Sequence, residues 1–346
     1  LMEIAVVNLV IGTKDRAQIV EMVEQYDRAN GVENHVSDIM KERVFEPLSI
    51  QKLANRTRAY MKIQDGCSQY CSYCIIPYAR GPIRSREPQE VVAEVKRLAE
   101  NGFKEVVLTG IHVASYGKDR RDTSLLDILK QVHEVEGIER IRFSSIEPNV
   151  VTEEFAQTMA ALPKVCDHFH LSLQSGCDKT LKEMNRKYDT EKYRQAVATL
   201  RKYLPKVALT TDIIVGFPGE TEEDFRESYA FAEEIGFAKI HVFPYSPKRG
   251  TPAAARKDQL LNAVKSERSH TLIQLSDRMA ADFLADAVGT DAEVLYERAV
   301  GDGIYEGHTT NYMKVHGRSE ADLTNRIAKT HITRAEGEML FGDVEV

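Results

Sequence analysis

The chain has 346 residues, more than one average domain, which predicts two or three structural units. With 42% hydrophobic and 29% charged residues it resembles an ordinary globular protein, and no run approaches the roughly 18 apolar residues of a membrane helix. The net charge of −7 argues against a general nucleic-acid-binding protein. The five cysteines and the absence of a secretory leader favour a reducing compartment, so we expect a cytoplasmic protein without a membrane partner.

The first 45 residues predict one strand and one helix, which is little for a domain. The run NLVIG (8–12) predicts the strand, and Thr13 or Asp15 is expected to cap the helix that follows. Residues 31–50 predict a linker. Because the chain begins with leucine, we expect its true N-terminus to be missing and residues 1–45 to be a truncated unit plus linker.

The middle of the chain alternates apolar runs with amphipathic helical patterns. The runs predict strands at 58–64, 104–110, 140–145, 168–174, 207–217 and 238–246, and the patterns predict helices at 87–101, 124–135, 151–162, 178–203, 221–235 and 256–285. Six strand–helix units predict a parallel α/β sheet in a closed or partly closed barrel, with any chemistry at the carboxyl ends of the strands. We assign this unit to residues 46–284.

The last unit, residues 285–346, changes to short alternating runs with glycines at the turns. This pattern predicts a small antiparallel barrel of about five strands. From residue 286 onward twelve Asp and Glu stand against six Lys and Arg. We therefore expect any contacts with nucleic-acid phosphates to be few and local.

The motif most typical of a chemical site is Cys67-x3-Cys71-x2-Cys74, in the loop after the first strand of the middle unit. A structural zinc site needs four ligands, and no fourth cysteine or histidine lies nearby, so three thiols favour a 4Fe–4S cluster with one open iron over zinc. From Gln51 to Arg86, seven Lys and Arg face Asp65 alone. Such a run is either a solvated charged face or a contact for a phosphate-bearing partner.

In its place after the first strand of a six-unit barrel, the cysteine motif resembles that of the radical S-adenosylmethionine (SAM) enzymes. The resemblance implies that the open iron binds the amino and carboxylate groups of SAM and that reduction of the cluster generates a 5′-deoxyadenosyl radical. The motifs DGCSQYCSYCIIPYARGPIRSR, VLTGIHVASYG, HLSLQSGCDKTLKEMNRKY, TDIIVGFPGETEEDF and YSPKRGTPAA together resemble the methylthiotransferases, and the C-terminal barrel resembles their TRAM module.

Within that family, GIHVASYGKD and HVFPYS are most similar to the tRNA branch acting on threonylcarbamoyladenosine beside the anticodon. The isopentenyladenosine branch is the first alternative and the ribosomal-protein branch the second. The expected fold is a partial (β/α)6 radical SAM barrel with a remnant N-terminal α/β domain and a C-terminal TRAM barrel.

The resemblance also assigns roles to single residues. It implies that the cluster ligands, which are both the metal-binding and the catalytic residues, are Cys67, Cys71 and Cys74. It implies contacts with SAM from Tyr73, Thr109, Gly110, Ser145, Gln174, Ser175, Arg186, Asp212, Val215 and Gly216. It implies contacts with tRNA from Arg80, Arg84, Arg86, Tyr116 and Arg249. Ordinary packing is the alternative for Tyr73, a strand-end turn for Thr109 and Gly110, and a surface ion pair for Arg186.

The expected activity is methylthiolation of a modified tRNA adenosine, with sulfur inserted at ring C2 and the methyl group supplied by a second SAM. The expected partners are tRNA, an electron donor and a sulfur donor, and the arginines would hold phosphates around an extruded base. A non-catalytic tRNA-binding chain with a degenerate metal site is the second hypothesis. A radical enzyme acting on a protein side chain is the third, and the basic stretch disfavours it.

One departure from the family pattern concerns the second cluster. The resemblance implies three further N-terminal cysteines in complete methylthiotransferases, whereas no cysteine precedes Cys67 here. The run VVNLVIGTKDRAQIVEMV (6–23) resembles the second half of their N-terminal domain, which implies that residues 1–45 are the C-terminal part of that domain plus linker. We therefore expect this chain to bind one cluster and SAM, and not to complete sulfur insertion by itself.

Overall fold

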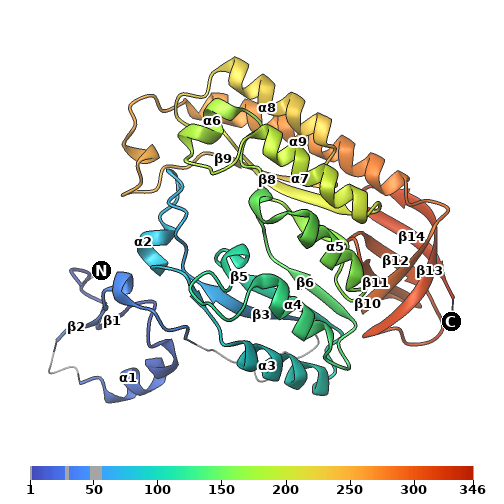
Figure 1. The fold of residues 1–346 in the computed structure, drawn as a ribbon, viewed down its shortest axis with the longest axis horizontal. Coiled ribbons are helices and arrows are strands. Elements are labelled where there is room, and N and C mark those ends of the chain that lie inside the picture. Colours follow the sequence, from blue (N-terminus) through green and yellow to red (C-terminus); the bar gives the residue numbers. More distant parts are fainter. Residues whose placement is uncertain (1, 28–30, 47–56, 346) are drawn as a thin grey trace.

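The computed structural model describes residues 2–27, 31–46 and 57–345, and Figure 1 shows their arrangement. A small N-terminal part is followed by a central α/β part, against which a C-terminal β-barrel packs. No helix in the described ranges has the length and apolarity needed to cross a membrane.

The N-terminal part contains strand β1 (Leu9–Ile11), helix α1 (Ile19–Gln25) and strand β2 (Glu33–His35), which pairs in parallel with β1. The predicted strand and helix are confirmed. The linker prediction was wrong for β2, because strand pairing orders it; positions 47–50 of that linker lie outside the described residues. Neither predicted cap forms, since Asp15 has a left-handed backbone without a capping bond and the Thr13 hydroxyl donates to the Ala79 carbonyl at 3.3 Å.

The central part contains the six predicted strands, all parallel within their sheets: β3 (Arg58–Asp65), β5 (Glu105–Gly110), β6 (Arg140–Phe143), β7 (His168–His170), β8 (Ala208–Val215) and β9 (Lys239–Pro244). A short strand that was not predicted, β4 (Arg84–Ser85), adds an antiparallel edge to β3. The sheets β4-β3-β5-β6 and β7-β8-β9 are joined by single bridges from Ile141 to Val165 and from Ile146 to Leu171. The result is a partly closed barrel of parallel strands, as predicted.

Helices flank this sheet: α2 (Ile76–Arg80), α3 (Pro88–Glu100), α4 (Leu125–His133), α5 (Glu153–Ala161), α6 (Asp178–Glu183), α7 (Thr190–Tyr203), α8 (Glu222–Ile235) and α9 (Asn262–Ala285). The prediction of a single helix over 178–203 was wrong, because the helix is interrupted between α6 and α7. Asn185 takes a positive φ of 60°, and the Asp189 side chain caps α7 by accepting from the Lys192 amide at 2.8 Å.

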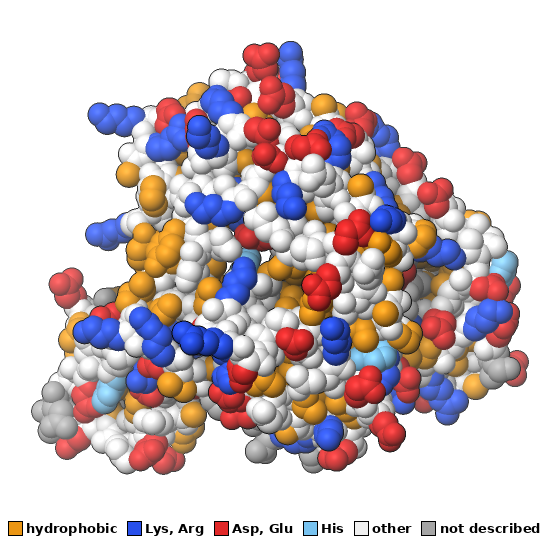
Figure 2. Space-filling model, in the orientation of Figure 1, with side chains coloured by type: hydrophobic (Ala, Val, Ile, Leu, Met, Phe, Trp, Pro, Cys, Tyr) orange, Lys and Arg blue, Asp and Glu red, His pale blue; other side chains and the backbone are white. Residues whose placement is uncertain are grey.

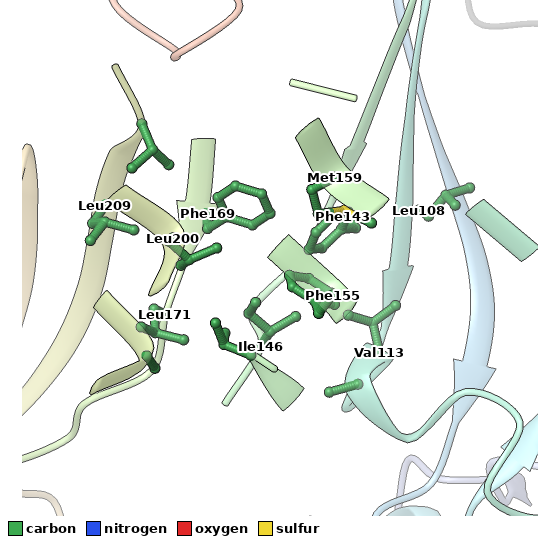
Figure 3. Close-up of a cluster of buried hydrophobic side chains, with 14 of the residues drawn as sticks. Leu108, Val113, Phe143, Ile146, Phe155, Met159, Phe169, Leu171, Leu200 and Leu209 are labelled. Atoms are coloured by element: carbon green, nitrogen blue, oxygen red, sulfur yellow. The ribbon is translucent and has the colours of Figure 1, made fainter. Parts of the chain in front are cut away.

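A buried aromatic cluster fills the seam between the two sheets (Figure 3). Phe143 of β6, Phe155 of α5 and Phe169 of β7 lie with ring centroids 5.4 to 6.3 Å apart in tilted or edge-on pairs. Such pairs stabilise a core beyond the burial of their area. The cluster therefore holds together sheets that only two bridges connect directly.

The C-terminal part is a closed barrel of five strands, β10 (Asp291–Gly301), β11 (Ile304–Thr309), β12 (Lys314–Arg318), β13 (Arg326–Glu336) and β14 (Met339–Val344). The predicted number of strands is confirmed. The barrel is not wholly antiparallel, since β12 and β14 pair in parallel to close it.

A buried charge cluster joins this barrel to the central sheet. Glu105, whose side chain is fully buried, lies 3.0 Å from both the Arg58 and the Arg142 Nε atoms. The two guanidinium groups also lie over the ring of Tyr312 from the β11–β12 turn, at 5.1 and 4.6 Å from its centroid. Arg140 adds a bond from Nη1 to the His308 carbonyl at 2.8 Å. One carboxylate thus organises the cations that position the barrel.

Replacing this carboxylate should loosen the junction. We expect Glu105→Gln to lower the free energy of unfolding by roughly 3 kcal/mol, because it leaves the buried Arg142 guanidinium without its carboxylate and leaves Arg58 with Glu297 alone. The measurement is urea denaturation followed by circular dichroism. Glu139→Gln is the matched control, since Glu139 is half-exposed beside Lys104 and should change stability by less than about 1 kcal/mol. Equal midpoints for the two variants would contradict this account.

Candidate functional site

The cysteine loop leaves the carboxyl end of β3 through a turn that requires glycine. Gly66 has a φ of +71°, and a Cβ there would lie 1.8 Å from the Pro82 carbonyl oxygen. The Cys67 amide donates to the Gly81 carbonyl and the Cys74 amide to the Cys71 carbonyl, both at 3.0 Å. The DG pair before the first cysteine therefore brings the loop back against the segment that follows α2.

The break between α6 and α7 clamps the other side of the loop. The Ser72 amide donates to the Met184 carbonyl at 3.0 Å, and the Ser72 hydroxyl to the Glu183 carbonyl at 2.7 Å. The Asn185 side-chain amide donates to the Tyr70 carbonyl at 2.8 Å. The loop is thus fixed to a second element more than a hundred residues away, which the sequence did not reveal.

The three thiols of the loop fit a soft metal cluster by their chemistry. They are unbridged, and burial raises the pKa of Cys67 to about 11, with a smaller contribution from the neighbouring Cys71 and Cys74. Burial also raises the pKa of Cys74. Across the described ranges no three His, Cys, Asp or Glu groups are already spaced as a metal site. Loading would therefore deprotonate these thiols and draw them together.

A buried ion pair lies directly beside the loop. Arg186, in the α6–α7 break, donates from Nη1 to Cys71 Sγ at 3.2 Å and from Nε to the Tyr188 hydroxyl at 2.8 Å. Its Nη2 atom lies 3.0 Å from Glu147 Oε1, and His112 Nε2 lies 3.4 Å from the same oxygen. Burial alone would raise the pKa of Glu147, but His112 and Arg186 outweigh it and lower that pKa. Arg186 is therefore a buried cation at the cysteines rather than a surface ion-pair partner.

Glu147 was missed by the sequence analysis. It follows the strand-end polar pair Ser144-Ser145 in SSIEP, at the edge where the chemistry was expected. A carboxylate directly after a barrel strand was the available signal.

Except for Asp212, which lies inside β8 beside His170, the other residues predicted to contact SAM lie at the same carboxyl edge of the sheet. Thr109 and Gly110 end β5, Ser145 follows β6, Asp212, Val215 and Gly216 lie in or after β8, and Gln174 and Ser175 lie between β7 and α6. Gln174 has a φ of 70°, and its backbone N–H donates to the Asp212 carbonyl of β8 at 2.8 Å. Tyr73 and Ile214 both pack on the buried cluster of Met184, Phe217, Tyr245 and Ala253. The fold thus brings these candidates to one edge, beside the cysteines.

The arginines of the basic stretch do not form an exposed row that could bind phosphates, because two of them pair with one carboxylate. Arg80 pairs with both oxygens of Asp65, at 3.0 and 2.6 Å, and Arg84 Nη2 lies 3.4 Å from the same carboxylate. Burial alone would raise the pKa of Asp65, but bonds from Arg80 and Lys62 lower it to about 2. Only 4% of the Arg84 side chain is exposed. Asp65 therefore draws Lys62, Arg80 and Arg84 inward, and the burial and pairing of Arg84 argue against its contact with phosphate.

The remaining candidates for tRNA contact divide into buried and exposed residues. Arg86 is buried near Glu90 and Glu94, and Tyr116 is buried with its hydroxyl donating to the Arg86 carbonyl at 2.9 Å. The burial of both side chains argues against direct contact with substrate. Arg249, in the segment after β9, is exposed and remains accessible to a partner.

Comparisons with known proteins place the chain in a family. The Radical SAM superfamily model matches residues 61–232. The chain is 43% identical over 340 residues to the threonylcarbamoyladenosine tRNA methylthiotransferase MtaB of Bacillus subtilis, covering 97% of this chain and 75% of that protein. It is 40% identical over 315 residues to a tRNA-2-methylthio-N(6)-dimethylallyladenosine synthase of a Thermoanaerobacter species, covering 89% of this chain and 66% of the relative.

A solved structure agrees in fold. Coproporphyrinogen III oxidase (HemN) of Escherichia coli superposes with a TM-score of 0.51 at 16% identity, over 65% of this chain and 53% of that one. Together with the identity to the methylthiotransferases, the fold and the cysteine loop lead to one conclusion. The chain belongs to the tRNA methylthiotransferases, transferases of the Radical SAM superfamily that use a 4Fe–4S cluster and SAM.

Proposed function

We propose that this chain takes part in methylthiolation of ring C2 of N6-threonylcarbamoyladenosine beside the anticodon of tRNA, as the part that binds the radical-generating cluster and SAM and that does not complete sulfur insertion by itself. The observation that carries the proposal is the 43% identity to the Bacillus subtilis threonylcarbamoyladenosine enzyme across 97% of the chain. Isopentenyladenosine is the second candidate substrate, supported by the 40% identity to the dimethylallyladenosine synthase over 89% of the chain.

In this proposal the residues of the site hold and orient the cofactors. Cys67, Cys71 and Cys74 would ligate three irons of the cluster, which when bound supplies the electron that cleaves SAM. Arg186 would hold its charge against Cys71 and beside the SAM carboxylate, and Glu147 would fix the direction of that guanidinium. Tyr73, Val215 and Gly216 would border the adenine, since the apolar cluster under Tyr73 is continuous with β8 through Ile214.

The exposed cations, rather than the buried arginines, would contact the tRNA backbone. Figure 2 shows Lys and Arg side chains gathered on the lower left of the view, near the N-terminal elements and α2. Arg249 is exposed and belongs to this class. Arg80, Arg84 and Arg86 would instead keep the cysteine loop rigid through Asp65 and the segment around it.

Removing the cation at the cysteines should affect both cofactors. We expect Arg186→Gln to weaken SAM binding by about tenfold and to lower the reduction potential of the cluster, because a charge-assisted hydrogen bond to a buried group is lost. Equilibrium dialysis with SAM and a redox titration followed by electron paramagnetic resonance measure the two effects. Arg194→Gln, a half-exposed ion-pair residue on α7, is the control and should change neither. An unchanged potential and SAM affinity in Arg186→Gln would refute the role.

The substrate is tested by the nucleosides of tRNA. In a strain that lacks the gene, we expect mass spectrometry of digested tRNA to show loss of the methylthio form of threonylcarbamoyladenosine, with its unthiolated precursor accumulating. The methylthio form of isopentenyladenosine should be unchanged and serves as the internal control. Loss of the isopentenyl product instead would establish the second candidate.

A further inference from the structure

A cavity of about 330 Å³ lies at the foot of the central barrel, where sheet β7-β8-β9 and the end of α9 meet the C-terminal barrel. No role in the site described above uses it. The sheet contributes three imidazoles and a lysine, from His168, His170, His241 and Lys239. The β11–β12 region contributes a phenol and a lysine, from Tyr312 and Lys314.

Two imidazoles in the cavity wall have unused polar atoms. The Thr210 hydroxyl pairs with His168 Nε2 at 3.1 Å and with His170 Nδ1 at 3.0 Å. The second nitrogens, His168 Nδ1 and His170 Nε2, are buried and have no hydrogen-bond partner in the described part of the chain. His170 Nε2 lies 3.3 Å from an Asp212 oxygen, but without hydrogen-bond geometry. Because buried polar atoms are normally paired, these nitrogens indicate a polar ligand.

The charges around the cavity favour an anionic group in that ligand. The lining carries two lysines and one carboxylate, Glu338. Glu338 pairs with Lys239 at 2.7 Å, and Lys239 also pairs with Asp277 at 3.1 Å, whereas Lys314 forms no ion pair with any residue that the structure describes. Arg58 and Arg142 lie behind the Tyr312 ring but already pair with Glu105, so Lys314 is the cation that remains for an anionic group. Burial lowers the pKa of His168 and His241, so both rings are neutral near pH 7 and can donate or accept.

The cavity and the residues expected to contact SAM at the carboxyl edge lie on one face of the sheet. Thr210, Asp212 and Ile214 alternate along β8 and therefore point to the same side, with His241 and Phe243 of β9 opposite the last two. Ile214 reaches the cluster that Tyr73 packs on. At about 3.3 Å per strand residue, Thr210 and Ile214 are separated by about 13 Å. A substituted nucleoside with its ring near the cysteines can extend along this face to the cavity.

We propose that this cavity binds the N6 substituent of the target adenosine and selects the threonylcarbamoyl group over an apolar dimethylallyl group. The inference rests on the proposed function, and it makes this cavity the part of the chain that determines which modified adenosine is bound. The threonylcarbamoyl group carries a carboxylate for Lys314 and a hydroxyl and a urea for His168 and His170. A dimethylallyl group would leave these buried groups unpaired, which a site built for hydrogen bonding discriminates against strongly.

Binding of modified anticodon stem-loops tests the assignment without turnover. Fluorescence anisotropy with the SAM-loaded protein compares stem-loops that carry threonylcarbamoyladenosine, isopentenyladenosine or adenosine. We expect the unaltered protein to prefer the first, and Lys314→Met and His170→Leu each to reduce that preference about tenfold. Lys329→Met is the matched control, because Lys329 is a half-exposed lysine of the same barrel that does not line the cavity.

The outcomes separate the two proposals. If the unaltered protein and both folded variants prefer threonylcarbamoyladenosine equally, the cavity assignment is overturned while the proposed substrate stands. If the unaltered protein shows no such preference, the proposed substrate and the cavity assignment both fail. Reduced preference in both variants, with the control unchanged, supports the assignment.

Discussion

The clamp between the cysteine loop and the break after α6 is the interaction on which the site depends. Residues 183–186 bind the backbone of the loop at Tyr70 and Ser72 and place Arg186 against Cys71. A continuous helix would direct these backbone groups into its own hydrogen bonds and could not offer them to the loop. One interrupted helix therefore both positions the thiols and brings a buried cation to them.

The sequence predicted the strands and helices of the central part well because their apolar spacing is local. The six parallel strands follow from apolar runs, and the five-stranded barrel follows from short alternating runs, which are patterns that each segment carries by itself. The break at Asn185 was missed because the helical pattern runs through it. Asp189, which caps the second helix, was the available local signal.

Features that depend on distant partners could not be predicted in the same way. The basic stretch looked accessible because Asp65 is only one acid, yet the fold gathers Lys62, Arg80 and Arg84 around its carboxylate. The role of Glu147 could not be predicted, because it depends on ion pairs with Arg186 and His112, which are far from it in sequence. Parallel strands brought the SAM candidates to one edge, as predicted, because that consequence of topology needs no side-chain detail.

The central claim is that the cysteine loop holds a cluster whose open iron binds SAM. The most direct measurement is electron paramagnetic resonance of the anaerobically reconstituted and reduced protein, with and without SAM. The account predicts a brown protein with a 4Fe–4S signal that SAM alters and that is lost when Cys67, Cys71 and Cys74 are all replaced by alanine. A colourless zinc protein, or a cluster signal that SAM leaves unchanged, would contradict it.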